Sequence, residues 1–304
     1  MAEEEACDEE AVCYLCLDGE VDEADRQPLR RDCACRGTDA GFVHLSCLTE
    51  YAATKSEQAN EMNEFVNPWF ACPSCHQNYQ NELGIHIATK FVLFVRRQYP
   101  DDTQLQVEAL YLKLVALNSM IERLQPVQKR EAGVTANVLI SLIDRMKNDA
   151  PLTTRYSQCE SYAYGVHGLI ALTEGSEESA RRAVAHFEKY LKVNEANSFA
   201  DGIATAKAKI AAAKSLFVGD NTEELVKASQ ELYETRVAEY GYEDDYTIDA
   251  GIDYAINLRK ANRGDEARDL LTMLFTTSKQ ILGPQHNTTK RVESELEEVI
   301  EVAK

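Results

Sequence analysis

The sequence has little positive charge. Its 304 residues include 32 Lys and Arg against 51 Asp and Glu, which gives a formal net charge of −19. A surface of this sign repels nucleic-acid phosphates, and no basic stripe with interleaved aromatic residues offsets it. We therefore expect no role in binding DNA or RNA.

Long apolar runs are also missing. The most apolar stretch, residues 83–95, carries His86 and Lys90, and it is shorter than the about 20 residues that a transmembrane helix needs. The first residues, MAEEEACDEEAVC, are acidic, whereas a secretory signal would be basic and then apolar. We expect no membrane span, no export, and a cytoplasmic or nuclear location.

The common catalytic motifs are absent as well. The sequence contains no P-loop, no Gly-x-Ser-x-Gly and no His-Glu-x-x-His pattern. Cys159 and His167 lie on one expected helix, but about 12 Å apart along its axis, which is too far for a nucleophile and its base. We therefore expect no catalytic residue.

Cysteine is almost absent from the last three quarters of the chain. Of nine cysteines only Cys159 lies beyond residue 75. Residues 1–80 also hold 17 acidic and 5 basic side chains, whereas the remainder is closer to balance. In a chain without an export signal, clustered cysteines favour metal ligation over disulfides. These features mark a separate N-terminal unit.

Between Cys13 and Cys75, seven cysteines and one histidine fall into four short pairs: Cys13-x2-Cys16, Cys33-x-Cys35, His44-x2-Cys47 and Cys72-x2-Cys75. Two ligands at such spacing on a tight turn can reach one tetrahedral ion. Eight thiolate and imidazole ligands select zinc over calcium or magnesium, and closed four-ligand shells are structural. We predict two structural Zn²⁺ ions. Because so short a segment buries little apolar surface, residues 10–80 should unfold without metal.

The order of these ligands resembles a known family. The segments CYLCL, DCACRGTDAGFVHLSCL and CPSC are similar to a RING-CH zinc finger, the RING variant of membrane-associated ubiquitin ligases. RING-type fingers interleave their ligand pairs. The resemblance therefore implies one zinc on Cys13, Cys16, His44 and Cys47, and a second on Cys33, Cys35, Cys72 and Cys75.

The same resemblance implies a partner surface. RING ligases grip a ubiquitin-conjugating enzyme through apolar side chains, and the matching positions here are Leu15, Leu48, Tyr51 and Pro73. The alternative for these residues is that they pack the finger's own core. Many active RING fingers carry Arg or Lys after the last ligand, whereas this chain has His76, which leaves open whether ligase activity is retained.

A plant-homeodomain finger, which reads histone tails, has the same ligand order and is the alternative family. Such a finger usually has a Trp just before its last pair, and Trp69 stands near that position. The eight-residue gap between Cys35 and His44 is about twice as long as in that family. The RING-CH interpretation is therefore preferred.

Residues 103–303 show apolar positions at helical spacing, broken by Gly, Pro and Asx turns. The expected fold class is mainly α: a small zinc-stabilised RING-CH finger of α+β type, followed by an α-helical repeat domain. The expected helices are 103–124, 130–148, 154–174, 177–193, 199–217, 221–240, 245–261, 264–282 and 286–303.

A fixed offset of 42 residues relates parts of this region. It aligns Thr205 with Thr247 and Thr289, and Gly241 with Gly283. The segment ANRGDEARDLLTMLFTTSKQILGPQHNTT resembles kinesin-light-chain-like tetratricopeptide repeats, and AYGVHGLIALTEG with SARRAVAHFEKYL is similar to an ordinary repeat. A non-repetitive helical domain is the alternative. Stacked pairs form a concave face that binds peptides or proteins, for which Tyr164, Lys214 and Asn257 are candidate lining residues.

These observations predict five segments: an acidic disordered N-terminus 1–9, a RING-CH finger 10–80, a helical linker 81–102, a helical pair 103–150 and tetratricopeptide-like repeats 151–304. The expected function is that of a soluble ubiquitin ligase. Its partners would be a ubiquitin-conjugating enzyme and a protein or peptide on the repeats. A non-catalytic zinc-binding scaffold is the alternative.

Overall fold

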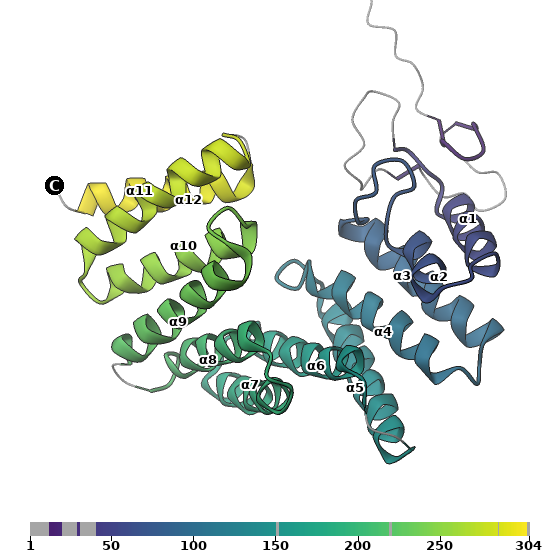
Figure 1. Cartoon of the computed structure of the whole chain (residues 1–304), viewed down its shortest axis with the longest axis horizontal. Coiled ribbons are helices and arrows are strands. Elements are labelled where there is room, and N and C mark those ends of the chain that lie inside the picture. Colours follow the sequence, from purple (N-terminus) through teal and green to yellow (C-terminus); the bar gives the residue numbers. More distant parts are fainter. Residues whose placement is uncertain are drawn as a thin grey trace, which may run out of the picture. The chain divides into compact units, whose positions relative to one another are not determined.

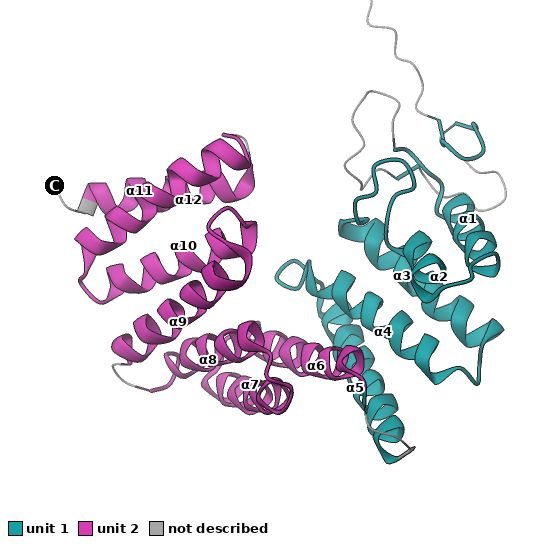
Figure 2. Ribbon diagram, in the orientation of Figure 1, with its two compact units in different colours: residues 1–152 teal, residues 153–304 magenta. Residues whose placement is uncertain are grey.

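The structure is a computed structural model that describes residues 12–19, 29–30, 41–149, 152–218, 221–284 and 286–302. The predicted N-terminal segment 1–9 lies outside these residues. The chain divides into two compact units, Met1–Leu152 and Thr153–Lys304 (Figure 2). The mainly α fold class is confirmed, because twelve α-helices account for most of the described residues. Their β-structure is limited to the isolated bridges Arg30↔Val43 and Ala71↔Asn78.

The described residues of unit 1 form five α-helices and one short 3₁₀ helix. Figure 1 labels the α-helices. The helices α4 and α5 form an adjacent packed pair, and α4 also packs on α3. The elements are α1 Leu45–Glu57, α2 Met62–Val66, η1 Asn67–Trp69, α3 Asn81–Gln98, α4 Thr103–Asn118 and α5 Pro126–Asp149.

The apolar stretch 83–95 lies within α3 and forms the centre of unit 1. This helix packs against α1 and η1 from the cysteine-rich segment and against α4 from the helical segment. Its buried residues occupy more than one stripe because it has neighbours on several sides. They are Leu83, Gly84, Ile85, Ile87, Ala88, Phe91, Val92 and Val95.

A group of aromatic rings joins the cysteine-rich segment to α3. Trp69 is fully buried and stacks on Phe91, with ring centroids 5.1 Å apart. The Trp69 Nε1–H donates to Ser56 Oγ at 2.7 Å, which satisfies the indole's buried polar atom. Phe65 and Phe94 add further ring contacts. The finger is therefore packed on a helix that follows it in sequence.

Unit 2 consists of helices that each pack on the next along the chain. Together with α4 and α5, they place one helix in each of the nine segments predicted from the sequence. The helices are α6 Thr154–Leu172, α7 Glu177–Asn197, α8 Ala200–Lys214, α9 Thr222–Tyr240, α10 Asp245–Lys260, α11 Gly264–Ile281 and α12 Asn287–Val302.

Residues that are 42 positions apart occupy equivalent positions in the helices of unit 2. Gly241 follows α9 and Gly283 lies just after α11, and both have positive φ, 86° and 87°, which favours glycine. The offset also relates Thr247 to Thr289, which are buried near the starts of α10 and α12. Stacked helix pairs of this kind fit a repeat domain.

Candidate metal centre

Four of the predicted ligands come together in the finger. The ligand atoms of Cys13, Cys16, His44 and Cys47 all lie within 4.8 Å of one another. The first two lie on a tight turn, His44 immediately precedes α1, and Cys47 lies in the first turn of that helix. The helix and the turn thus present one pair of ligands each.

The first turn is built by two backbone hydrogen bonds. The Cys13 N–H donates to the Asp18 carbonyl at 2.9 Å, and the Leu17 N–H donates to the Cys13 carbonyl at 2.8 Å. Leu17 has a φ of 65°, the left-handed conformation that closes the turn. This geometry turns both cysteine side chains of the pair toward the same point.

His44 presents a defined nitrogen to the cluster. Its Nδ1 lies 3.4 Å from Cys16 Sγ and 3.8 Å from Cys47 Sγ, close to the about 3.6 Å edge of a tetrahedron with Zn–S near 2.3 Å and Zn–N near 2.0–2.1 Å. The opposite nitrogen, Nε2, lies 3.1 Å from the Gly19 carbonyl oxygen. A proton on Nε2 would be donated to that carbonyl, which leaves Nδ1 as the ligand.

The pKa values of the Cys13 and Cys47 thiols are shifted in opposite directions. Burial opposes ionisation of Cys13, but backbone hydrogen bonds from Cys16, His44 and Leu15 outweigh it and lower the pKa to about 7. Burial and the neighbouring Cys13 and Cys16 raise the pKa of Cys47 to about 12. A full set of thiolates therefore requires a cation between them, and this donor set fits zinc.

The Cys72–Cys75 turn repeats the geometry of the first. The Cys72 N–H donates to the Gln77 carbonyl and the His76 N–H donates to the Cys72 carbonyl, both at 2.9 Å. His76 has a φ of 58°, at the position that corresponds to Leu17. The proposed partners of this pair, Cys33 and Cys35, lie outside the described residues.

The cysteine-rich segment has a family match. Residues 13–77 match the family model of the RING-variant domain. This region contains every predicted ligand and favours the RING-CH interpretation over the plant-homeodomain one. The chain thus carries a RING-variant zinc finger, and its Cys/His cluster is consistent with zinc binding. No curated protein matches the chain.

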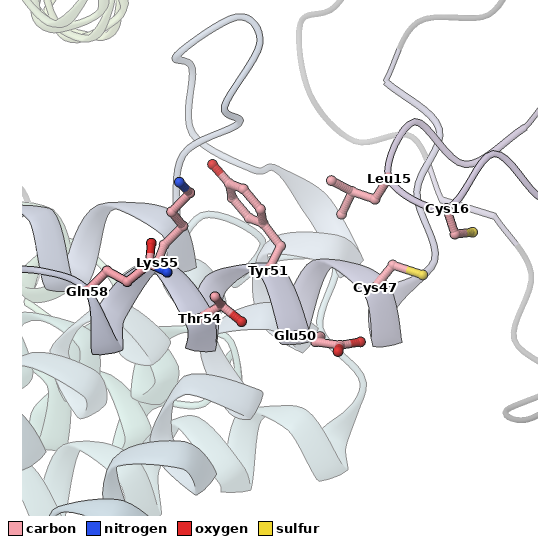
Figure 3. A pocket seen from close by; sticks show the side chains of 8 residues that line it. All are labelled: Leu15, Cys16, Cys47, Glu50, Tyr51, Thr54, Lys55 and Gln58. Atoms are coloured by element: carbon pink, nitrogen blue, oxygen red, sulfur yellow. The ribbon is translucent and has the colours of Figure 1, made fainter.

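A cavity of about 360 Å³ lies beside this Cys/His cluster, between the first cysteine turn and α1 (Figure 3). Two of the predicted enzyme-contacting residues, Leu15 and Tyr51, line it. Lys55 follows Tyr51 by one helical turn, and its Nζ lies 5.9 Å from the Tyr51 ring centroid. The complete lining is Leu15, Cys16, Cys47, Glu50, Tyr51, Thr54, Lys55 and Gln58.

Leu48 requires a correction. It was expected to contact a conjugating enzyme, but its side chain is fully buried, with 0% exposure. Because α1 turns this position inward, Leu48 belongs to the core of the finger. Pro73 is partly exposed in the second turn and is not among the residues that line the cavity.

Four lining residues were not predicted: Glu50, Thr54 and Lys55 on α1, and Gln58, which directly follows it. With Cys47 and Tyr51 they follow the spacing i, i+3, i+4, i+7, i+8 and i+11, which is one face of a helix. That spacing was available in the sequence once Cys47 was placed at the start of a helix.

Among the described residues, no helix combines the length and apolar character that crossing a membrane requires.

Proposed function

We propose that the chain is a RING-CH-type ubiquitin ligase. The finger would recruit a ubiquitin-conjugating enzyme, and the helices of unit 2 would bind a substrate or an adaptor. The observation that carries the proposal is a RING-variant domain with an open cavity beside its Cys/His cluster, lined by Leu15 and Tyr51. An enzyme loop with an apolar side chain fits such a cavity.

The finger would act by positioning. A closed shell of Cys and His ligands leaves no open coordination position, so its metal would be structural. Transfer of ubiquitin from the conjugating enzyme's thioester would then depend on how the finger orients the enzyme and its cargo. The side chains on the cavity would supply the grip, and the amino group that attacks the thioester would belong to the substrate.

A second zinc site completes the proposed finger. Cys72 and Cys75 would share an ion with Cys33 and Cys35, as in other fingers that interleave their ligand pairs. The matching turn geometry of the Cys72 pair supports this assignment. Elemental analysis should find two zinc ions per chain, and one in a Cys72→Ser variant that remains folded. A single zinc in the unaltered chain would contradict the assignment.

The role of unit 2 rests on its architecture. Stacked helix pairs with a 42-residue repeat support the resemblance to tetratricopeptide repeats, although no tetratricopeptide family matches. Such stacks offer an extended surface to a protein or peptide. In a ligase, that surface would choose the target.

Discharge of ubiquitin from a charged conjugating enzyme to free lysine tests the ligase. Leu15→Ala and Tyr51→Ala should each slow discharge by about tenfold or more, because a large apolar contact contributes about 1.5–3 kcal/mol. Leu93→Ala is the matched control, since Leu93 is 56% exposed on α3. Zinc content is measured in parallel. Variants that lose zinc would show that these side chains are structural.

A scaffold is the second candidate function, and His76 favours it. Many active RING fingers use Arg or Lys at that position, and an imidazole has fewer N–H donors than a guanidinium or an ammonium group to share between two partners. If a broad panel of conjugating enzymes shows no stimulated discharge while both zinc ions remain bound, the scaffold replaces the ligase.

A further inference from the structure

A second cavity, of about 420 Å³, lies within unit 2. Helices α8, α9 and α10 supply most of its lining, and both α8 and α10 pack on α9. We call it the α8–α10 groove. Its lining is Leu172, Thr205, Ala208, Lys209, Ala212, Ser215, Leu225, Ser229, Leu232, Arg236, Asp253, Ile256, Asn257 and Lys260.

The groove follows from helical spacing. The lining residues of α10, from Asp253 to Lys260, recur at i, i+3, i+4 and i+7 and so form one face. Asn257, one of the candidates named from the sequence, lines the groove. The other two, Tyr164 and Lys214, are not among the lining residues. Aliphatic side chains from four helices make much of the surface, so the groove can accept an apolar side chain.

The charged residues in the groove are mainly cationic. Arg236 already has an anionic partner within unit 2, because its Nε donates to Asp201 Oδ1 at 2.8 Å. The one lining carboxylate, Asp253, accepts from Arg291 Nη2 at 2.6 Å. Lys209 and Lys260 remain, and within the described part of the chain neither forms a salt bridge. Among the described residues, neither ammonium group therefore lies within salt-bridge distance of a carboxylate, although Asp253 attracts Lys209 from farther away.

Lys209 is the more confined of these two cations. Its side chain is partly buried, and this burial lowers its pKa because the charged form loses solvation. Attraction to Asp253 opposes this loss, whereas repulsion from Arg236 adds to it. The Lys209 Nζ also lies 5.9 Å from the centroid of the Phe187 ring, which favours the charged form. A cation in this position gains most from an anionic ligand. Such a groove is unusual in a chain with a net charge of −19.

We propose that the α8–α10 groove binds a segment of a partner protein in which acidic side chains alternate with apolar ones. Carboxylates of the segment would pair with Lys209 on α8 and Lys260 on α10, while the apolar side chains would pack on aliphatic residues such as Leu232 and Ile256. The inference deepens the proposed role of unit 2 in partner binding and rests on it. It does not rest on ubiquitin transfer by the finger.

A short fluorescein-labelled peptide of alternating Glu and Leu, amidated at its C-terminus, is the probe, and fluorescence anisotropy with the full chain is the measurement. The peptide should bind, and a Lys209→Gln/Lys260→Gln variant should bind it at least tenfold more weakly, about 1.4 kcal/mol. Lys207→Gln is the matched control, since Lys207 lies on α8 but pairs with Glu231 at 2.5 Å and does not line the groove. That variant should stay within about twofold of the unaltered chain, as expected for an exposed ion pair.

A variant that is expected to bind the Glu peptide more tightly strengthens the test. Asp253→Asn removes the lining carboxylate and should tighten binding of the Glu peptide. Equal binding of a Gln–Leu peptide would overturn the proposal, as would equal weakening by Lys207→Gln. A Gln–Leu peptide that binds only with a free C-terminus would also overturn it, because the ligand would then be a terminal carboxylate.

Ubiquitin discharge to free lysine separates this inference from the proposed ligase. It needs only the finger, so Lys209→Gln/Lys260→Gln should leave it unchanged. Loss of peptide binding with normal discharge therefore concerns the groove alone. An inactive finger in a chain that still binds the Glu peptide would overturn the ligase and leave the groove assignment standing.

Discussion

Trp69 stacks on Phe91 with an interplanar angle of 23°, and this contact joins η1 of the zinc finger to α3. Both side chains have 0% exposure. The finger therefore has two sources of stability, its metal ligands at one end and an aromatic core at the other. A finger excised at residue 80 would lose the second, because α3 begins at Asn81.

Trp69→Ala should lower the free energy of unfolding of unit 1 by about 3–5 kcal/mol, the usual cost of deleting a buried Trp side chain. Urea denaturation followed by far-ultraviolet circular dichroism measures it. Leu93→Ala, at an exposed position on α3, should change it by no more than about 0.5 kcal/mol. Similar small losses in both variants would show that the aromatic core contributes little.

His76→Arg should increase ubiquitin discharge by the finger. His76 is exposed and directly follows the last ligand, where an Arg could donate hydrogen bonds to the enzyme and to ubiquitin together. The backbone at this position has a φ of 58°, in the left-handed region, and this conformation costs Arg more than His. The side chain at this position is exposed to solvent. Discharge kinetics with unchanged zinc content measure the effect. A rate equal to that of His76→Gln would mean that this position contacts neither partner.

Helical periodicity predicted the helices well and their ends less well. The predicted segment 103–124 stops at Asn118 in the structure, where tight turns such as Arg123 N–H to the Met120 carbonyl replace the helical pattern. The next helix starts at Pro126 rather than at residue 130, because proline is favoured in the first helical position, where its missing N–H costs nothing.

Long-range packing lay beyond the sequence. Spacing predicted the metal ligands, but only the family resemblance implied that Cys13 and Cys16 join His44 and Cys47, as the structure places them. The family resemblance did not distinguish Leu48, which packs in the core, from Tyr51, which lines the cavity three residues later. The packing of α3 against α1 likewise depends on contacts between segments that are separated in sequence.

A stacked histidine pair makes the stability of unit 2 depend on pH. The rings of His167 on α6 and His186 on α7 lie 4.9 Å apart. Within the described residues, His167 Nε2 and His186 Nδ1 are buried without a hydrogen-bond partner. Burial, with smaller repulsion from His186 and Lys189, lowers the pKa of His167 to about 4. Burial, with repulsion from Lys189 and Arg182, also lowers the pKa of His186.

The sign of the pH effect follows from these shifts. An unfolded histidine takes up a proton near pH 6.5, whereas folded His167 stays neutral down to about pH 4. Between these values the unfolded chain binds more protons, so the stability of unit 2 should fall as the pH is lowered. Thermal unfolding at pH 7 and pH 5 should show a smaller decrease for His167→Gln/His186→Gln than for the unaltered chain. His76→Gln, at an exposed position in unit 1, should keep the original dependence, and an equal decrease in all three proteins would assign it to other groups.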